Sequence, residues 1–199
     1  STQGYRRQRQ MCIRDSLITY KIYPNGRLYV YHSAVPKQDM LRFGFQMTLP
    51  GSYEYVNWYG RGPHPSYRDR KTGAALGRYQ STVTALEHRY MRPQESSNRT
   101  DTYDLYVCDS HGEGFRVQAY YETPFAFSAY HYTTTGLDKA AHIHEIPYDS
   151  SLTTLNIDGV QCGVGGDLPG QGAVRAPYRV TAGEKCSYAF ILEPMHKKK

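Results

Sequence analysis

The sequence lacks the features that define several common function classes. It has no uninterrupted apolar run near the roughly 18 residues of a membrane-spanning helix. It also has no GxxxxGK or GxGxxG loop, no GxSxG elbow and no HExxH pair. These absences argue against a membrane partner, a standard nucleotide-binding loop, and the common serine hydrolase and metalloprotease signatures.

Cysteine and tryptophan are also scarce. Trp58 is the single tryptophan, and the four cysteines are Cys12, Cys108, Cys162 and Cys186. They contain no CxxC pair and match no zinc-binding spacing, so we expect buried, reduced thiols.

The basic charge is confined to the two ends of the chain. The formal net charge is +6, but residues 1–16 hold four arginines against one aspartate, and three lysines close the sequence. Without these ends, basic and acidic side chains are equal in number. A surface that binds nucleic acid by releasing counterions has no compositional support, so we expect no nucleic-acid partner.

What the chain does contain is typical of strands and turns. Its 199 residues include 20 tyrosines, 18 glycines and 11 prolines, a length that suits one domain. Eight or nine short strands are expected within residues 17–35, 41–50, 53–60, 77–86, 102–110, 115–121, 125–133, 153–164 and 186–194. Only residues 134–146 suggest a helix of one or two turns, capped by Thr134 or Thr135. The pattern predicts an all-β, antiparallel β-sandwich.

The stretch NWYGRGPHPSYRDRK, residues 57–71, is the first candidate for a site. Its prolines remove backbone donors, which argues against a phosphate-binding loop. Its aromatic and arginine side chains suit stacking on bases or sugars. The alternative is that Arg68, Asp69 and Arg70 form a local ion-pair cluster that orders the loop, and we favour this interpretation.

Three further groups remain open. The glycines of residues 163–172, around Asp167, suit either a ligand loop or a tight turn. His142 and His144 are two spaced imidazoles without an obvious third ligand, so no metal is expected. The spacing of four carboxylates, Glu87, Glu95, Asp101 and Asp104, does not indicate whether they pair.

The segment MCIRDS, residues 11–16, back-translates to a sequence that resembles the transposon end of sequencing-library adapters. We therefore expect residues 1–16 to be non-native, with a disordered basic arm as the alternative, and residues 195–199 to be a basic tail.

Five stretches, in the same order along the chain, resemble the small-chain domain of glycoside hydrolase family 2 β-galactosidases, which is their C-terminal fifth domain. They are VNWYGRGPHPSYRDRKTGAALGRYQSTV, YMRPQESSNRTD, FAFSAYHYTTTGLDKAAHIHEI, LNIDGVQCGVGGD and PYRVTAGEKCSYAFILEP. The resemblance spans residues 17–194 and implies a large, galactose-mutarotase-like supersandwich that is partial at its N-terminus.

The resemblance also implies a function. The complete enzymes hydrolyse terminal β-galactosides such as lactose through two glutamates on a separate catalytic barrel, with Mg and Na ions bound by other domains. This chain is therefore expected to be an inactive accessory domain that packs against that barrel, contributes to the galactoside cleft and forms part of a homo-oligomer. The alternative is a free-standing carbohydrate-binding or aldose-mutarotase-like protein, with His64, His131 or His144 as the acid or base. The compartment, cytoplasm or periplasm of a bacterium, stays open.

Site residues follow from the same resemblance. The substrate-cleft loop maps onto Asp167, Leu168, Pro169, Gly170 and Gln171, and the tryptophan of the family pattern GGDDSW falls on Gly170. Either another residue such as Tyr178 or a loop of the barrel replaces its ring, or the substrate range differs. The family pattern GPxENYPDR appears as GPHPSYRDR, which implies a structural loop made of Trp58, Tyr67, Asp69 and Arg70.

Overall fold

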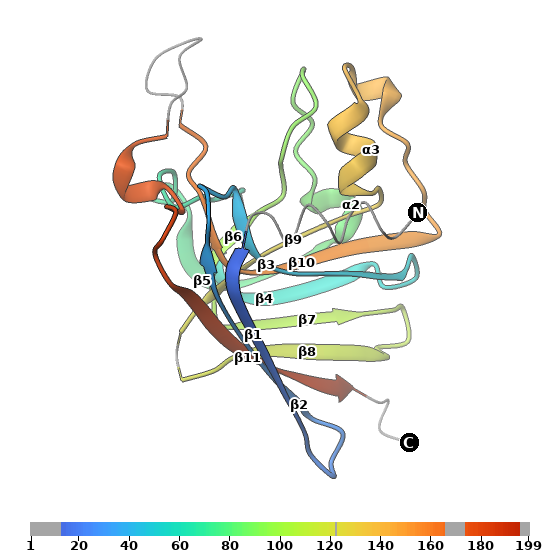
Figure 1. Cartoon of the computed structure of the whole chain (residues 1–199). Coiled ribbons are helices and arrows are strands. Elements are labelled where there is room, and N and C mark those ends of the chain that lie inside the picture. Colours follow the sequence, from blue (N-terminus) through green and yellow to red (C-terminus); the bar gives the residue numbers. More distant parts are fainter. Residues whose placement is uncertain (1–12, 122, 166–173, 196–199) are drawn as a thin grey trace.

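The computed structural model describes residues 13–121, 123–165 and 174–195, and within these it is a two-layer antiparallel sandwich (Figure 1). The strands are β1 (Ile13–Ile22), β2 (Leu28–Pro36), β3 (Arg42–Pro50), β4 (Tyr55–Gly62), β5 (Ala75–Thr82), β6 (Arg99–Thr102), β7 (Asp104–Cys108), β8 (Gly114–Ala119), β9 (Phe125–Tyr130), β10 (Leu152–Gln161) and β11 (Cys186–Met195). The predicted all-β sandwich is confirmed.

The two sheets are unequal in size. The larger sheet has seven strands in the order β1-β2-β11-β8-β7-β4-β5, and the smaller has four in the order β3-β10-β9-β6. The buried core between them draws Val30, Leu105 and Val117 from the larger sheet and Phe127 and Ile157 from the smaller.

The helical elements are short and mostly cover the smaller sheet. They are α2 (Val83–Leu86), α3 (Thr134–Lys139), and the 3-10 turns η1 (Ile143–Glu145) and η2 (Ala176–Tyr178). In Figure 1, α2 and α3 lie above β9 and β10. Leu137 of α3 packs with Tyr130, Tyr132 and Ile146 in a second apolar cluster.

The predicted hairpin at residues 17–35 is present, and its turn shows why. Gly26 adopts a φ of 81° and its N–H donates to the carbonyl of Tyr23, which closes the turn between β1 and β2. β1 begins at Ile13 rather than at Leu17, and Ser16 pairs with Ala34 of β2. Residues 13–16 therefore belong to the sheet, although the sequence predicts a non-native or disordered segment there.

Two other local expectations differ from the structure. The strand predicted over residues 77–86 ends at Thr82, because the Thr82 hydroxyl accepts from the N–H of Ala85 and caps α2. The cap of α3 is Thr133, whose hydroxyl accepts from Gly136, rather than Thr134 or Thr135.

Candidate functional site

The loop that follows β4 carries the candidate site. After the cis peptide bond between Gly62 and Pro63, the chain turns back on itself at Tyr67 and Arg70, whose backbones exchange hydrogen bonds of 3.0 and 2.9 Å. Arg68 and Asp69 occupy the tip between them. Tyr67 anchors the base of this turn: its ring is buried and its hydroxyl donates to the carbonyl of Glu95.

Asp69 holds one end of a distant segment. Its carboxylate accepts the backbone N–H of Val164 at 3.1 Å and the backbone N–H of Gly165 at 2.8 Å. A Cβ on Gly163 would overlap this carboxylate, so the close approach requires glycine at that position. Residues 163–165 are thereby fixed against the tip of the 63–71 loop.

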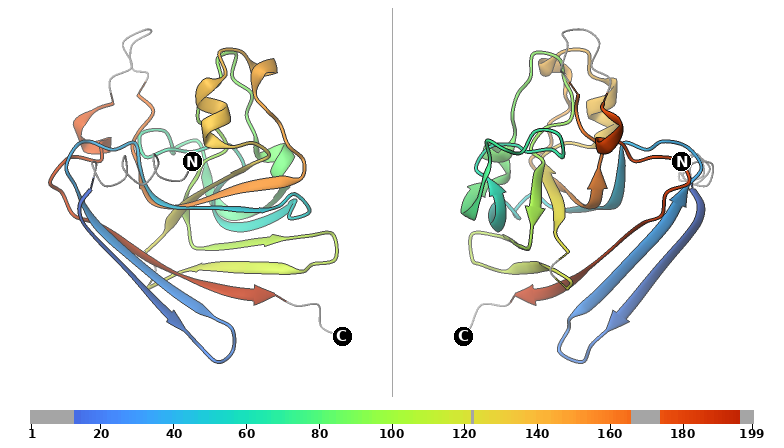
Figure 2. Two further views of the ribbon diagram at one scale, coloured as in Figure 1. Left: turned by 45° about the vertical axis from the view of Figure 1, so that its right-hand side comes forward. Right: turned by 90° about the vertical axis from the view of Figure 1, so that its left-hand side faces the viewer.

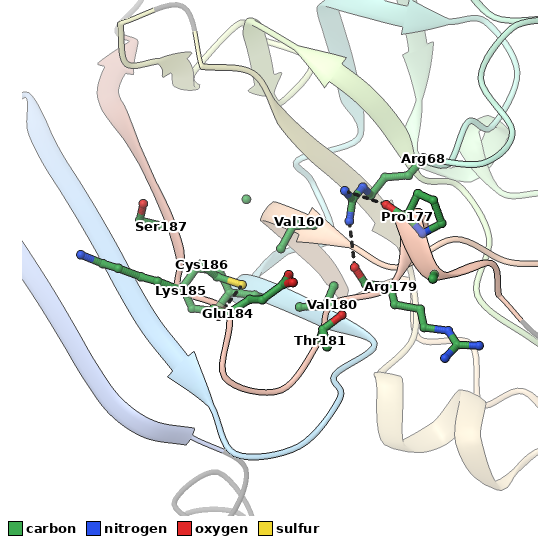
Figure 3. A pocket seen from close by; sticks show the side chains of 13 residues that line it. Arg68, Val160, Pro177, Arg179, Val180, Thr181, Glu184, Lys185, Cys186 and Ser187 are labelled. Atoms are coloured by element: carbon green, nitrogen blue, oxygen red, sulfur yellow. Dashed lines mark hydrogen bonds between the residues drawn. The ribbon is translucent and has the colours of Figure 1, made fainter.

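Arg68 holds the other end. Its guanidinium donates to the carbonyls of Arg179, at 3.2 Å, and Pro177, at 3.4 Å (Figure 3). The backbone N–H of Gly163 also donates to the carbonyl of Tyr178 at 2.9 Å, which ties the two ends to each other. Two adjacent residues at one loop tip therefore position the chain before and after residues 166–173.

The ion-pair cluster expected among Arg68, Asp69 and Arg70 has a different form in the structure. Within the described ranges, Asp69 pairs with neither arginine. Arg70 instead lies over the Tyr67 ring at 5.1 Å and donates to the Tyr90 hydroxyl. The loop is ordered by contacts with backbone groups of other segments, by the ring of Tyr67 and by the hydroxyl of Tyr90.

Trp58 lies in β4, within the core, rather than in the loop. Its ring is 3% exposed and packs on Tyr79 and Phe127, and its indole N–H donates to the carbonyl of Arg61. Asp167, Leu168, Pro169, Gly170 and Gln171 lie outside the described residues, so their predicted role stays a prediction. Tyr178 is in η2 and half-buried.

A cavity of about 410 Å³ lies beside the loop tip. Arg68, Pro177 and Arg179 form one wall, Glu184–Ser187 form another, and Phe43 and Val160 also line it (Figure 3). Burial raises the pKa of the Cys186 thiol, so this side chain stays protonated near neutral pH. The same holds for Cys162, and neither thiol is a poised nucleophile.

His131, one of the candidate acid or base residues, is held by contacts within the protein. His131 faces two acceptors: Nε2 lies 2.6 Å from Oε2 of Glu54, and Nδ1 lies 2.7 Å from the carbonyl of Leu152. Burial acts to raise the pKa of Glu54, but hydrogen bonds from Thr84 and His131 together hold it below its usual value. Such a ring has no free nitrogen for a substrate.

The other histidines are more exposed. His142 and His144 stack with ring centroids 5.5 Å apart, and His142 pairs with Glu145 of its own turn. His64 is exposed on the loop. In the part of the chain that the structure describes, no group of three or more His, Cys, Asp or Glu side chains could hold a metal ion.

A charge network around the buried Asp158 adjoins the loop and was not predicted from the sequence. Arg42 contacts Asp158 at 3.1 Å through Nε and at 2.5 Å through Nη2, and contacts Glu95 at 3.1 Å through Nη1. Burial raises the pKa of Glu95 to about 7, Arg42 opposes this shift and Asp158 adds to it. The aspartate that follows Ile157 inside the strand LTTLNIDGVQ was the available signal, because a buried charge needs a partner.

The four carboxylates whose pairing was left open do not meet one another. Asp101 bonds Arg61 and Lys71, and Asp104 bonds Arg116. Glu87 accepts from the Tyr148 hydroxyl, and Glu95 belongs to the Arg42 network. No pair of these carboxylates forms an acid and nucleophile arrangement in the described residues.

Comparison with known proteins decides the family. The sequence model described as Beta galactosidase small chain matches residues 2–192. The chain belongs to the β-galactosidase small-chain family. The match includes residues 2–16, whose predicted adapter origin stays a prediction.

The relatives of this small-chain sequence are much longer proteins. It is 30% identical over 181 residues to a β-galactosidase of Priestia megaterium, which covers 89% of this chain and 17% of that protein. It is 33% identical to a β-galactosidase of Halalkalibacterium halodurans, where the match covers 87% of this chain and 18% of that protein. It is 37% identical to a β-galactosidase of Vibrio cholerae, where the match covers 74% of this chain and 14% of that protein. The chain thus spans about a sixth of the length of these relatives. No helix in the described residues is long and apolar enough to cross a membrane.

Proposed function

We propose that this chain is an accessory domain of a glycoside hydrolase family 2 β-galactosidase that hydrolyses terminal β-D-galactosides such as lactose. In this function it packs against the catalytic barrel and contributes the loop from Asp167 to Gln171 to the galactoside cleft. The family match over residues 2–192 carries the proposal. The two catalytic glutamates, and the Mg and Na ions, belong to other domains of the complete enzyme.

The geometry of the loop tip supports this role. An accessory domain that shapes a cleft must hold its contributing segment in a fixed position, because substrate affinity depends on preorganised contacts. Asp69 and Arg68 provide such support by binding residues 164–165 and 177–179 respectively. The small-chain sandwich supplies a rigid base for them, since Tyr67 and Trp58 are buried in it.

A chimeric enzyme tests the proposal. The chain is first assayed alone with o-nitrophenyl galactoside, and no hydrolysis is expected. It then replaces the matching part of the Priestia megaterium β-galactosidase, and the chimera is expected to hydrolyse the substrate, whereas the same enzyme with that part deleted is not. Hydrolysis by the isolated chain, or equal activity of the deleted and chimeric enzymes, contradicts the proposal.

The alternative of an aldose mutarotase rests on the pair of His131 and Glu54. His131, but not Glu54, lines a small cavity of about 140 Å³, and both of its ring nitrogens are already engaged by protein acceptors. Optical rotation of a fresh solution of one galactose anomer distinguishes the two functions. Acceleration by catalytic amounts of the chain supports the alternative.

A further inference from the structure

Among the residues that the structure describes, nothing covers the apolar inner face of β1. In an antiparallel ladder, paired residues lie on the same face of the sheet. Ile18 pairs with His32 and Tyr20 with Val30, and His32 and Val30 are buried against the smaller sheet. Ile18, Tyr20 and Ile22 therefore face the core side, yet they are 42, 56 and 82% exposed.

The smaller sheet ends too early to cover this face. It has four strands against seven, and its edge on this side is β3. Phe45, Met47 and Leu49 of β3 point into the core but stay only partly buried. In both views of Figure 2 the hairpin of β1 and β2 diverges from the layer of β3 and β10. The cavity of Figure 3 also lies between the layers, with Phe43 from one sheet and Cys186 from the other.

The chemistry of the two surfaces defines what fits between them. An open edge strand binds an extended segment through its backbone groups, and the uncovered face accepts alternate apolar side chains. The inner residues of both strands, from Ile18 to Ile22 and from Phe43 to Leu49, carry no charge. The expected occupant is consequently a β-strand with apolar residues at every second position, rather than a charged peptide.

The relatives indicate where such a strand comes from. This chain covers only 17 and 18% of the first two, so each has more than four fifths of its length outside the matched part. We propose that β1 and the open edge of β3 form a docking site for an extended, apolar segment of the remaining β-galactosidase polypeptide. The segment adds to β3 and covers Ile18, Tyr20 and Ile22. This inference rests on the proposed function.

The Priestia megaterium chimera described above also tests this docking site. Hydrogen exchange of β1 and β3 is compared between the isolated chain and the chimera, and amides of both strands are expected to exchange at least about tenfold more slowly in the chimera. The variant with Ile18→Asp and Tyr20→Asp is expected to lose this protection and to lower the melting temperature of the chimera but not that of the isolated chain. The matched control is Leu17→Asp, on the opposite face of β1, where the side chain is 57% exposed. It is expected to change neither quantity.

Three results overturn the docking site. An active chimera whose protection lies in other strands leaves the proposed function intact and removes this interface. Protection of β1 and β3 in the isolated chain that grows with its concentration makes a second copy of the chain the occupant. Equal effects of the inner-face and Leu17→Asp variants exclude the apolar contact. An inactive chimera with β1 and β3 protected contradicts the proposed function instead and leaves the surface assignment standing.

Discussion

The carboxylate of Asp69 accepts a hydrogen bond of 2.8 Å from the backbone N–H of Gly165, which lies 96 residues further along the chain. With the second bond from Val164, one side chain satisfies two consecutive backbone donors. The N–H groups of a glycine-rich segment are otherwise left to water, so the carboxylate selects one of its many conformations.

Replacement of Asp69 by alanine is expected to destabilise the fold by about 1 to 3 kcal/mol, because two charge-assisted hydrogen bonds are lost. Asp69→Asn keeps one acceptor oxygen, so it is expected to cost less. Urea unfolding of the chain measures both changes. The matched control is Asp109→Ala, which removes a carboxylate that also accepts two backbone N–H groups, from His111 and Glu113.

The control separates stability from substrate binding. In the chimeric enzyme, Asp69→Ala is expected to raise KM for o-nitrophenyl galactoside more than Asp109→Ala does at equal loss of stability. The same KM for both variants counts against a role of Asp69 in holding the cleft segment.

Gly163→Ala tests the close approach of Gly163 and the Asp69 carboxylate from the side of the glycine. Its new methyl group would overlap the Asp69 carboxylate, and overpacking of this kind costs about 1 to 3 kcal/mol. The same substitution in an Asp69→Ala background is expected to cost much less, since the obstructing oxygen atoms are gone. A double-mutant cycle of unfolding free energies measures the coupling. Additive effects of the two substitutions contradict the assigned contact.

Most strands could be predicted from the sequence because they are short runs rich in aromatic and β-branched residues between glycine and proline breaks. β6 was not separated as a strand of its own: Arg99–Thr102 is polar throughout, and its burial depends on partners elsewhere, such as the bond of Thr100 to Ser66. A strand whose hydrogen-bonding partners are distant has no periodic signal of its own.

The candidate site was located only in part. The stretch of residues 57–71 was singled out, yet the partners of Asp69 and Arg68 were assigned within the stretch instead of to segments about 100 residues away. Local spacing shows which charges are neighbours in sequence, but a two-residue turn between Tyr67 and Arg70 directs those charges away from each other. The sheet order that brings the segments together depends on the whole fold.

Because of the pair of Glu54 and His131, we expect the free energy of unfolding to fall at acid pH. The pKa of Glu54 is lowered in the folded chain, so its contribution is complete above the unfolded value of about 4.3 and is lost as the pH falls through the folded value. Glu54→Gln is expected to reduce the free energy of unfolding at neutral pH by no more than about 1 kcal/mol, because the side chain is partly exposed. Urea unfolding from roughly pH 3 to 7 is expected to show less acid dependence in the variant. Glu113→Gln, in the β7–β8 turn, is the control, and the same flattening there contradicts the assignment.

Disruption of the network of Arg42, Asp158 and Glu95 is expected to reduce the free energy of unfolding more than the loss of Glu54 does. Arg42→Met leaves the buried carboxylate of Asp158 and the half-buried carboxylate of Glu95 without their cation. Breaking a fully buried pair costs about 3 to 5 kcal/mol, and the lower end is expected here because Arg42 and Glu95 are partly exposed. Burial raises the pKa of both carboxyl groups, so without Arg42 each favours its protonated form in the folded chain. The stability lost by the variant is therefore expected to increase as the pH rises through the Glu95 value of about 7.

Urea unfolding at roughly pH 5 and pH 8 measures this increase. Arg27→Met provides the matched control, since Arg27 pairs with Glu193 at 2.7 Å but its side chain is 45% exposed. An exposed pair contributes at most about 1 kcal/mol, and its loss is expected to be similar at both pH values. If the two arginine variants lose equal stability, the Arg42 network is a surface feature rather than part of the fold. A loss for Arg42→Met that does not increase at the higher pH shows instead that ionisation of the carboxylates does not depend on the arginine.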